Sequence, residues 1–147
     1  MENVLEFMFG ASRRINRSEY WLSIFRFMVA GLFAAVILAT AAGIATPLLI
    51  IAIVLVLIPW LMWGAAIHTE RLHDRCKSAW WLLAFYVVPG ALGRLSSIAW
   101  LGGTAGLILH YALELTAFGL TAWGFVEIGC LRGTEGSNRY GPNPLSR

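Results

Sequence analysis

No Asp, Glu, Lys or Arg interrupts residues 27–69, which read FMVAGLFAAVILATAAGIATPLLIIAIVLVLIPWLMWGAAIHT. This run has 43 residues, whereas one membrane-spanning helix needs roughly 20 apolar residues. Gly43 and Pro47 lie near its middle and are typical of a tight connection. The run therefore predicts two membrane spans, over about 19–42 and 46–67.

Two further apolar stretches follow a polar segment at 68–78. They predict a third span over about 79–101 and a fourth over about 107–129, joined by a glycine-rich turn. The sequence thus predicts an all-α, polytopic membrane protein. We expect one membrane domain over residues 1–147, a four-transmembrane-helix bundle with a tail at 130–147. The apolar segment Met1–Gly10 is expected to lie along the membrane interface as a short amphipathic piece.

The composition supports a membrane protein. Hydrophobic residues make up 59% of the chain and charged residues only 13%, whereas a soluble domain has about 25% charged residues. The net charge of +3 could suggest nucleic-acid binding. We do not expect a nucleic-acid partner, because the positions of the basic residues are explained by membrane topology and by anionic lipid headgroups.

The basic residues predict the orientation of the spans. Nine of them lie before the first span, between the second and third, or after the fourth: Arg13, Arg14, Arg17, Arg71, Arg75, Lys77, Arg132, Arg139 and Arg147. The other two connections contain no Lys or Arg. Because Lys and Arg accumulate in cytoplasmic loops, both termini are expected in the cytoplasm.

One ionisable residue near the middle of the predicted third span, Arg94, has a possible partner in the fourth, Glu114. Arg94 and Glu114 are each ten residues from Thr104, in the connecting turn. An antiparallel hairpin brings them to the same depth, so we expect them to form an ion pair, with His110 one turn from Glu114 on the same face. This group could simply hold the hairpin together, or it could relay protons or ions.

The first span also carries a groove of small residues, because Gly31, Ala35, Ala39 and Gly43 are spaced four apart. Such a groove lets another helix approach closely. It could form a seam with another span of the same chain, or the interface of a homo-oligomer.

The sequence contains no pattern that predicts catalysis or a cofactor. His68, Glu70, His73, Asp74 and Cys76 fall within nine residues but match no zinc-ligand spacing, and we expect no metal. A Ser/His/Asp set, a phosphate-binding loop and a dinucleotide fingerprint are all missing from the chain. We therefore expect a protein that is not an enzyme, with a lipid-modifying reaction at His73 and Asp74 as a weaker alternative.

Three motifs, in this order, resemble one family. They read RINRSEYW at 14–21, RLHD at 71–74 followed by SAWW at 78–81, and GTEGSNRYGPNP at 133–144. Together they resemble the bacterial inner-membrane family called domain of unknown function 805. Arg13 departs from the pattern, since the family usually has Gly there. The resemblance implies a small multi-pass protein of the inner membrane and implies no activity.

All three motifs fall on the cytoplasmic side of the predicted topology, and they contain more polar residues than anchoring requires. We expect Glu19 and Asp74 to accept hydrogen bonds from nearby arginines. The expected cluster contains Arg14, Arg17, Glu19, Arg71, His73, Asp74, Asn138 and Arg139. It could stabilise the bundle, or it could bind a lipid headgroup or a membrane protein partner.

The favoured function is accordingly a binding or scaffolding module whose partners are membrane lipids, a membrane protein or a second copy. The alternative is a small transporter or transporter subunit that uses Arg94, His110 and Glu114.

Overall fold

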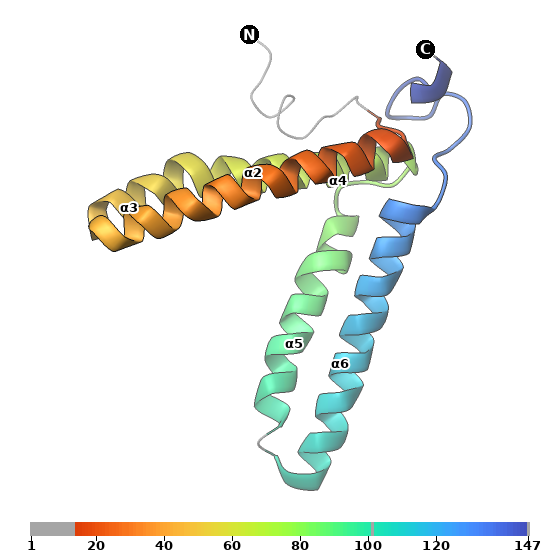
Figure 1. Cartoon of the computed structure of the whole chain (residues 1–147). Helices are drawn as coiled ribbons and strands as arrows, with labels where there is room; N and C mark the ends of the chain where they lie inside the picture. The colour runs from red at the N-terminus through yellow and green to blue at the C-terminus, as the bar shows by residue number, and fades with distance from the viewer. Residues whose placement is uncertain (1–13, 101, 147) are drawn as a thin grey trace.

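The computed structural model describes residues 14–100 and 102–146, which contain helices and no β-strand. Two helical hairpins diverge from a shared corner, near which the described part of the chain begins and ends (Figure 1). The first hairpin runs through α2 (Arg17–Ile44), α3 (Thr46–Ala52), the π-helical turn η1 (Ile53–Leu57) and α4 (Ile58–Asp74). The second comprises η2 (Leu83–Val87), α5 (Val88–Ala99), α6 (Gly103–Phe125) and η3 (Val126–Cys130), and a short 3-10 turn, η4 (Pro144–Ser146), follows. The expected N-terminal interfacial segment lies outside the described residues.

Three of these helices are long and apolar enough to cross a membrane. They cover Arg17–Ile44, Thr46–Asp74 and Gly103–Cys130. The remaining apolar helix, Leu83–Ala99, is shorter. Its 17 residues extend about 25 Å at 1.5 Å per residue, slightly less than a hydrocarbon core of roughly 30 Å.

The start of α2 is defined by a capping box. The Asn16 side chain accepts from the Glu19 backbone N–H at 2.9 Å, and the Glu19 carboxylate accepts from the Asn16 N–H at 3.3 Å. This exchange satisfies two backbone donors that a helix start otherwise leaves without partners. At the other end, Ala45 is extended and Pro47 lies in the first turn of α3, where a missing N–H costs nothing.

Two π-helical turns precede prolines. η1 ends two residues before Pro59, and η2 ends two residues before Pro89. A proline inside a helix cannot donate its hydrogen bond, and its ring clashes with the carbonyl four residues earlier. A wider turn at that point lets the helix continue past the proline.

Glycines and aromatic rings pack the first hairpin together. The Phe27 and Trp60 rings are stacked with centroids 4.4 Å apart. A Cβ on Gly31 would lie 2.8 Å from the Trp60 ring, and one on Gly64 would lie 2.8 Å from the Phe27 ring. Gly31 therefore belongs to an intramolecular seam with α4. The expected groove does not continue along that seam, because Ala35 and Ala39 are exposed.

The second hairpin turns through Gly103, whose φ of +66° favours glycine. A Cβ on Gly106 would lie 2.3 Å from the Ala99 carbonyl oxygen, so the two helices approach too closely there for any side chain.

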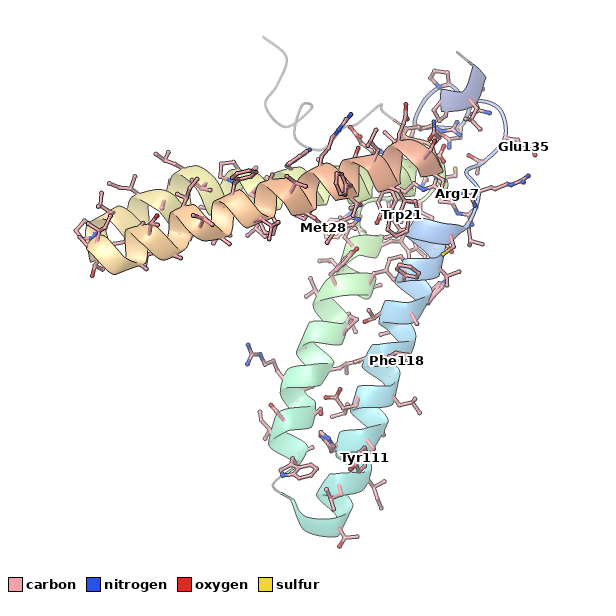
Figure 2. All side chains as sticks on the ribbon, in the orientation of Figure 1. Arg17, Trp21, Met28, Tyr111, Phe118 and Glu135 are labelled. Atoms are coloured by element: carbon pink, nitrogen blue, oxygen red, sulfur yellow. The ribbon has the colours of Figure 1, made fainter. Side chains whose placement is uncertain are left out.

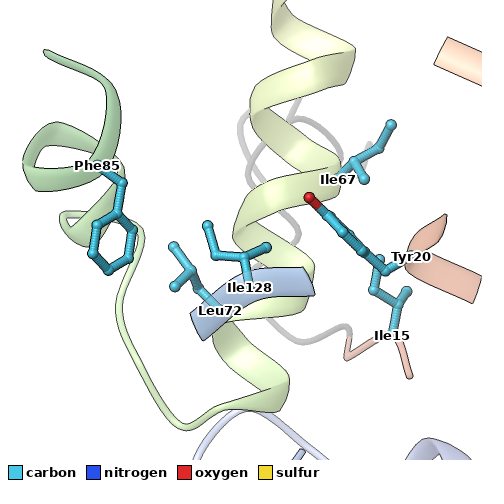
Figure 3. Packing of buried hydrophobic residues seen from close by; sticks show 6 residues of the cluster. All are labelled: Ile15, Tyr20, Ile67, Leu72, Phe85 and Ile128. Atoms are coloured by element: carbon cyan, nitrogen blue, oxygen red, sulfur yellow. The ribbon is translucent and has the colours of Figure 1, made fainter. Parts of the chain in front are cut away.

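The buried core lies at the corner where the hairpins meet. Figure 3 shows its side chains, which come from both hairpins and from the segment before α2: Ile15, Tyr20, Ile67, Leu72, Phe85 and Ile128. Beyond the corner most apolar side chains are exposed, such as Met28, Tyr111 and Phe118 (Figure 2). In each of the three long helices, only 11% of the apolar stretch is buried within the chain. The apolar faces of these helices are therefore available to lipid.

The expected four-helix bundle differs from the observed arrangement. The two hairpins meet at the corner and then diverge, instead of packing side by side along their length (Figure 1). The difference has a physical reason. Lipid tails are as apolar as the side chains of a helix, so an apolar pattern does not indicate which faces pack against protein.

Candidate functional site

The three family-like motifs meet at the corner. The end of α4 supplies Arg71, His73 and Asp74, the segment before α2 supplies Arg14, and the tail after η3 folds back over both. We call the buried ionic group Arg14, Arg71 and Asp74 the corner cluster.

Asp74 is the anion at the centre of the corner cluster. Its Oδ1 accepts from Nε and Nη2 of Arg14 at 3.2 and 3.0 Å, and its Oδ2 accepts from Nη1 of Arg71. All three residues are buried, and Asp74 is only 2% exposed. Charge-assisted hydrogen bonds of this kind offset the cost of burying the ions.

Backbone carbonyl groups satisfy the remaining guanidinium donors. Arg71 donates to the carbonyl oxygens of Ile128, at 2.9 Å, and Leu131. Arg14 donates to the carbonyl oxygens of Thr134 and Gly136 at 2.7 and 2.8 Å. Both arginines therefore join the ion cluster to the end of α6–η3 and to the tail.

The tail is held by its own hydrogen bonds to α4. The N–H and hydroxyl of Thr134 donate to the Asp74 carbonyl at 2.8 and 3.0 Å, and the Asn138 amide donates to the His73 carbonyl at 2.9 Å. The Tyr140 ring stacks on His73 with centroids 3.8 Å apart. Asn138 also accepts from the Tyr140 N–H at 2.8 Å, and so makes a turn of the kind that asparagine favours.

A second ionic group lies beside the first. Glu127, which is 5% exposed, accepts from Nε of Arg75 at 3.0 Å, and the Lys77 ammonium is 3.7 Å from the same oxygen. Lys77 also lies over the Trp81 ring, 4.0 Å from its centroid. This group links the loop after α4 to η3.

Three predicted cluster residues have other roles. Glu19 accepts from no arginine among the described residues, and its carboxylate closes the capping box. Arg17 donates to the Cys130 carbonyl at 3.1 Å, and Arg139 donates to the Cys76 carbonyl at 3.1 Å. All three side chains are exposed, and their sequence spacing gave no sign of these backbone partners.

Sequence reasoning missed two residues of the tail that shape the corner. Thr134 bridges Asp74 and Arg14. Gly133 packs against the Asp74 carboxylate so closely that a Cβ would lie 1.9 Å from Oδ2. The only available signal was their position in the third motif.

A pocket of about 350 Å³ opens beside the corner cluster. We call it the corner pocket; it is lined by residues 16–18 at the start of α2, by Asp74, and by tail residues 132–135 and 143–145. Arg17 and Arg132 are exposed at this pocket, and Glu135 is the exposed acid. Since Asp74 is already paired with two arginines, the lining has an excess of positive charge.

The polar group in the second hairpin differs from the expected ion pair. Ser96 donates from Oγ to the Glu114 carboxylate, and the same Oγ lies 2.7 Å from Nδ1 of His110. Among the described residues Arg94 forms no ion pair, and its side chain is exposed. The expected pair fails because Arg94 lies two residues from Ser96, about 200° around the helix. When Ser96 faces Glu114, Arg94 faces away.

An all-helical chain with several apolar helices and a polar corner is typical of a polytopic membrane protein. The family model described as "Protein of unknown function (DUF805)" matches residues 8–142, and the chain belongs to this family. It is 32% identical to the inner membrane protein YhaH of Escherichia coli strain K12, over 96% of this chain and 92% of the relative. The same values hold for YhaH of Escherichia coli O157:H7. No solved structure matches the chain.

Proposed function

We infer that the chain is a four-span protein of the bacterial inner membrane that binds a phosphate-bearing lipid headgroup in the corner pocket, with both termini in the cytoplasm. The observation that supports binding there is the pocket of about 350 Å³ with exposed Arg17 and Arg132 in its lining. Arginine presents several N–H donors in a planar fork that suits phosphate oxygens. The proposed activity is binding, and no catalytic step is assigned.

The distribution of charge supports the orientation. Seven of the basic residues named above lie in described segments that meet at the corner: Arg14, Arg17, Arg71, Arg75, Lys77, Arg132 and Arg139. The links between α2 and α3 and between α5 and α6 lie at the distant ends of the hairpins (Figure 1). By the positive-inside rule, the corner faces the cytoplasm.

The corner cluster itself has a structural part in this proposal. Arg14, Arg71 and Asp74 are buried and satisfied by one another and by backbone groups. A ligand would have to displace those bonds to reach them. Arg17 uses Nη1 for the Cys130 carbonyl, and its other guanidinium donors make no hydrogen bond within the described residues, so a ligand can reach them without displacing the corner cluster. We therefore assign binding to the exposed arginines of the pocket.

The pocket also lies where a headgroup would be found. It opens at the first residues of α2, a 28-residue apolar helix whose start is at one end of a membrane span. A helix start carries partial positive charge, which favours an anion.

The test compares lipids bound to purified protein by native mass spectrometry. Replacing both pocket arginines, as Arg17→Gln with Arg132→Gln, should lower retention of phosphatidylglycerol about tenfold, since each arginine contributes a charge-assisted contact. Arg139→Gln is the matched control, because Arg139 is an exposed arginine at the corner outside the pocket lining. Thermal unfolding checks that each variant is folded.

Titration with soluble glycerol phosphate separates two sources of the same chemistry. Binding of the lipid but not of the soluble phosphate supports a headgroup site. Equal binding of both favours a soluble phosphate compound. Unchanged lipid retention in the double variant contradicts the proposed site.

Transport is the second candidate function, and one observation favours it. Ser96 joins His110 to Glu114 through hydrogen bonds within the second hairpin, and such chains can pass protons inside membranes. A folded Glu114→Gln variant that loses proton or solute flux in proteoliposomes would support this candidate. Flux equal to that of empty liposomes in the unchanged protein would contradict it.

A further inference from the structure

The second hairpin exposes one cation and one anion inside its apolar length. Arg94 of α5 and Glu114 of α6 are both exposed. No ion pair joins either one to another residue in the part of the chain that the structure describes. Ionisable side chains within a membrane are costly unless they are paired or reach water.

Both charges lie at the same depth of the hairpin. Ser96 contacts His110 and Glu114, so it is level with the midpoint of those two residues, at position 112. Because the helices are antiparallel, moving two residues back along α5 corresponds to moving two residues forward along α6. Arg94 is therefore level with Glu114, although the two side chains face different directions.

The surface around Arg94 allows another helix to approach. Gly90, four residues before Arg94, and Ser97, three residues after it, share its face of α5, each about one turn away. A Cβ on Gly90 or on Gly93 would meet no atom within 4 Å, so neither glycine is needed for close packing against the described residues. Small residues on an outward face permit close contact between membrane helices.

Glu114 is held in position to accept from outside. Ser96, which is fully buried, donates to Oε1 of Glu114. No hydrogen bond within the described chain occupies Oε2. A guanidinium from a neighbouring molecule can therefore reach this oxygen while Ser96 fixes the carboxylate.

We propose that the second hairpin is the interface with a second copy of this chain, in which Arg94 of each copy pairs with Glu114 of the other. Two copies inserted in the same orientation have all four charges at one depth, so no vertical shift is needed. Every copy supplies one exposed cation and one exposed anion at the same depth, so two identical chains carry the complementary charges that such a pair needs. The interface does not depend on the corner pocket.

The experiment measures association of labelled copies in liposomes by Förster transfer between fluorophores on the native cysteines. Arg94→Glu alone and Glu114→Arg alone should each weaken self-association about tenfold or more, because like charges then meet in lipid. A mixture of the two variants should associate like the unchanged protein, since each position 94 then faces an opposite charge at position 114. Arg26→Gln is the control, because Arg26 is an exposed arginine in the other hairpin.

The doubly exchanged chain, R94E with E114R, gives a sharper result. It should associate with itself but not with the unchanged protein, which an ion pair within one chain could not produce. Failure of the mixture to exceed the single variants would overturn the proposal.

The neutral variants Arg94→Gln and Glu114→Gln keep the test valid if the exchanged charges prevent folding. They should weaken association equally. A loss with Glu114→Gln alone would mean that Arg94 reaches the headgroups instead, and would overturn the proposed pair. Cross-linking in native membranes exclusively to a different protein would overturn the choice of a second copy.

Discussion

At the scale of single residues, Asp74 balances two buried arginines. Arg14 and Arg71 both donate to its carboxylate, and the three side chains are almost fully enclosed. Asp74→Asn would remove the anion and leave two cations without a counter-charge. We expect this change to lower the free energy of unfolding by about 3–5 kcal/mol, the usual cost of breaking a buried ion pair.

Tryptophan fluorescence during thermal unfolding in detergent measures that loss. Glu135→Gln is the matched control, because Glu135 is an exposed acid near Asp74 in the pocket lining. Asp74→Asn with the melting temperature of the unchanged protein would show that the corner cluster does not stabilise the fold.

A substitution at Cys76 tests how backbone conformation, and not charge, affects stability. It follows α4 with φ of +58°, in the left-handed region that glycine adopts without steric cost. Cys76→Gly should therefore stabilise the protein, by about 1 kcal/mol. The second exposed cysteine, Cys130, ends a π-helical turn, so Cys130→Gly should give no gain in the same chemical-denaturation experiment. A loss of stability in Cys76→Gly would contradict this account.

At the scale of elements, the sequence predicted well where helices start and break. It predicted poorly which side of a helix packs against its neighbour. Asn16 and Glu19 were recognisable as a capping box, and Pro47 marked the break after α2, because both signals act within a few residues. Arg94 shows what the sequence could not predict. Its distance from the turn predicted its depth, but its direction depended on which side of α5 packs against α6, and small apolar residues on several sides leave that choice open.

The seam of the first hairpin gives a prediction at this scale. Gly31→Ala would place a Cβ 2.8 Å from the Trp60 ring and disturb its stacking with Phe27. Overpacking of this kind costs about 1–3 kcal/mol. Gly43→Ala is the matched control in the same helix, because a Cβ there meets no atom within 4 Å and alanine favours the helix. Equal melting temperatures for the two variants would mean that the seam does not depend on Gly31.

At the scale of the whole molecule, the sequence located the corner but did not predict how the hairpins diverge from it. The motifs at 14–21, 71–81 and 133–144 were expected to meet, and Arg71, Asp74 and Asn138 do lie together. The order of the spans alone brings these segments to one side. The tail contacts through Gly133 and Thr134 were missed, because backbone carbonyl groups accept most of the arginine bonds and carry no sequence signal.

The orientation of the whole molecule gives the last prediction. Cys76 and Cys130 are both exposed, and both belong to the corner that we propose to face the cytoplasm. A membrane-impermeant maleimide should therefore label them in inverted inner-membrane vesicles and leave them unlabelled in intact spheroplasts. A Thr104→Cys variant without the native cysteines should show the reverse, because Thr104 lies at the far end of the second hairpin. Labelling of the native cysteines in intact spheroplasts would reverse the proposed orientation and place the corner pocket on the periplasmic side.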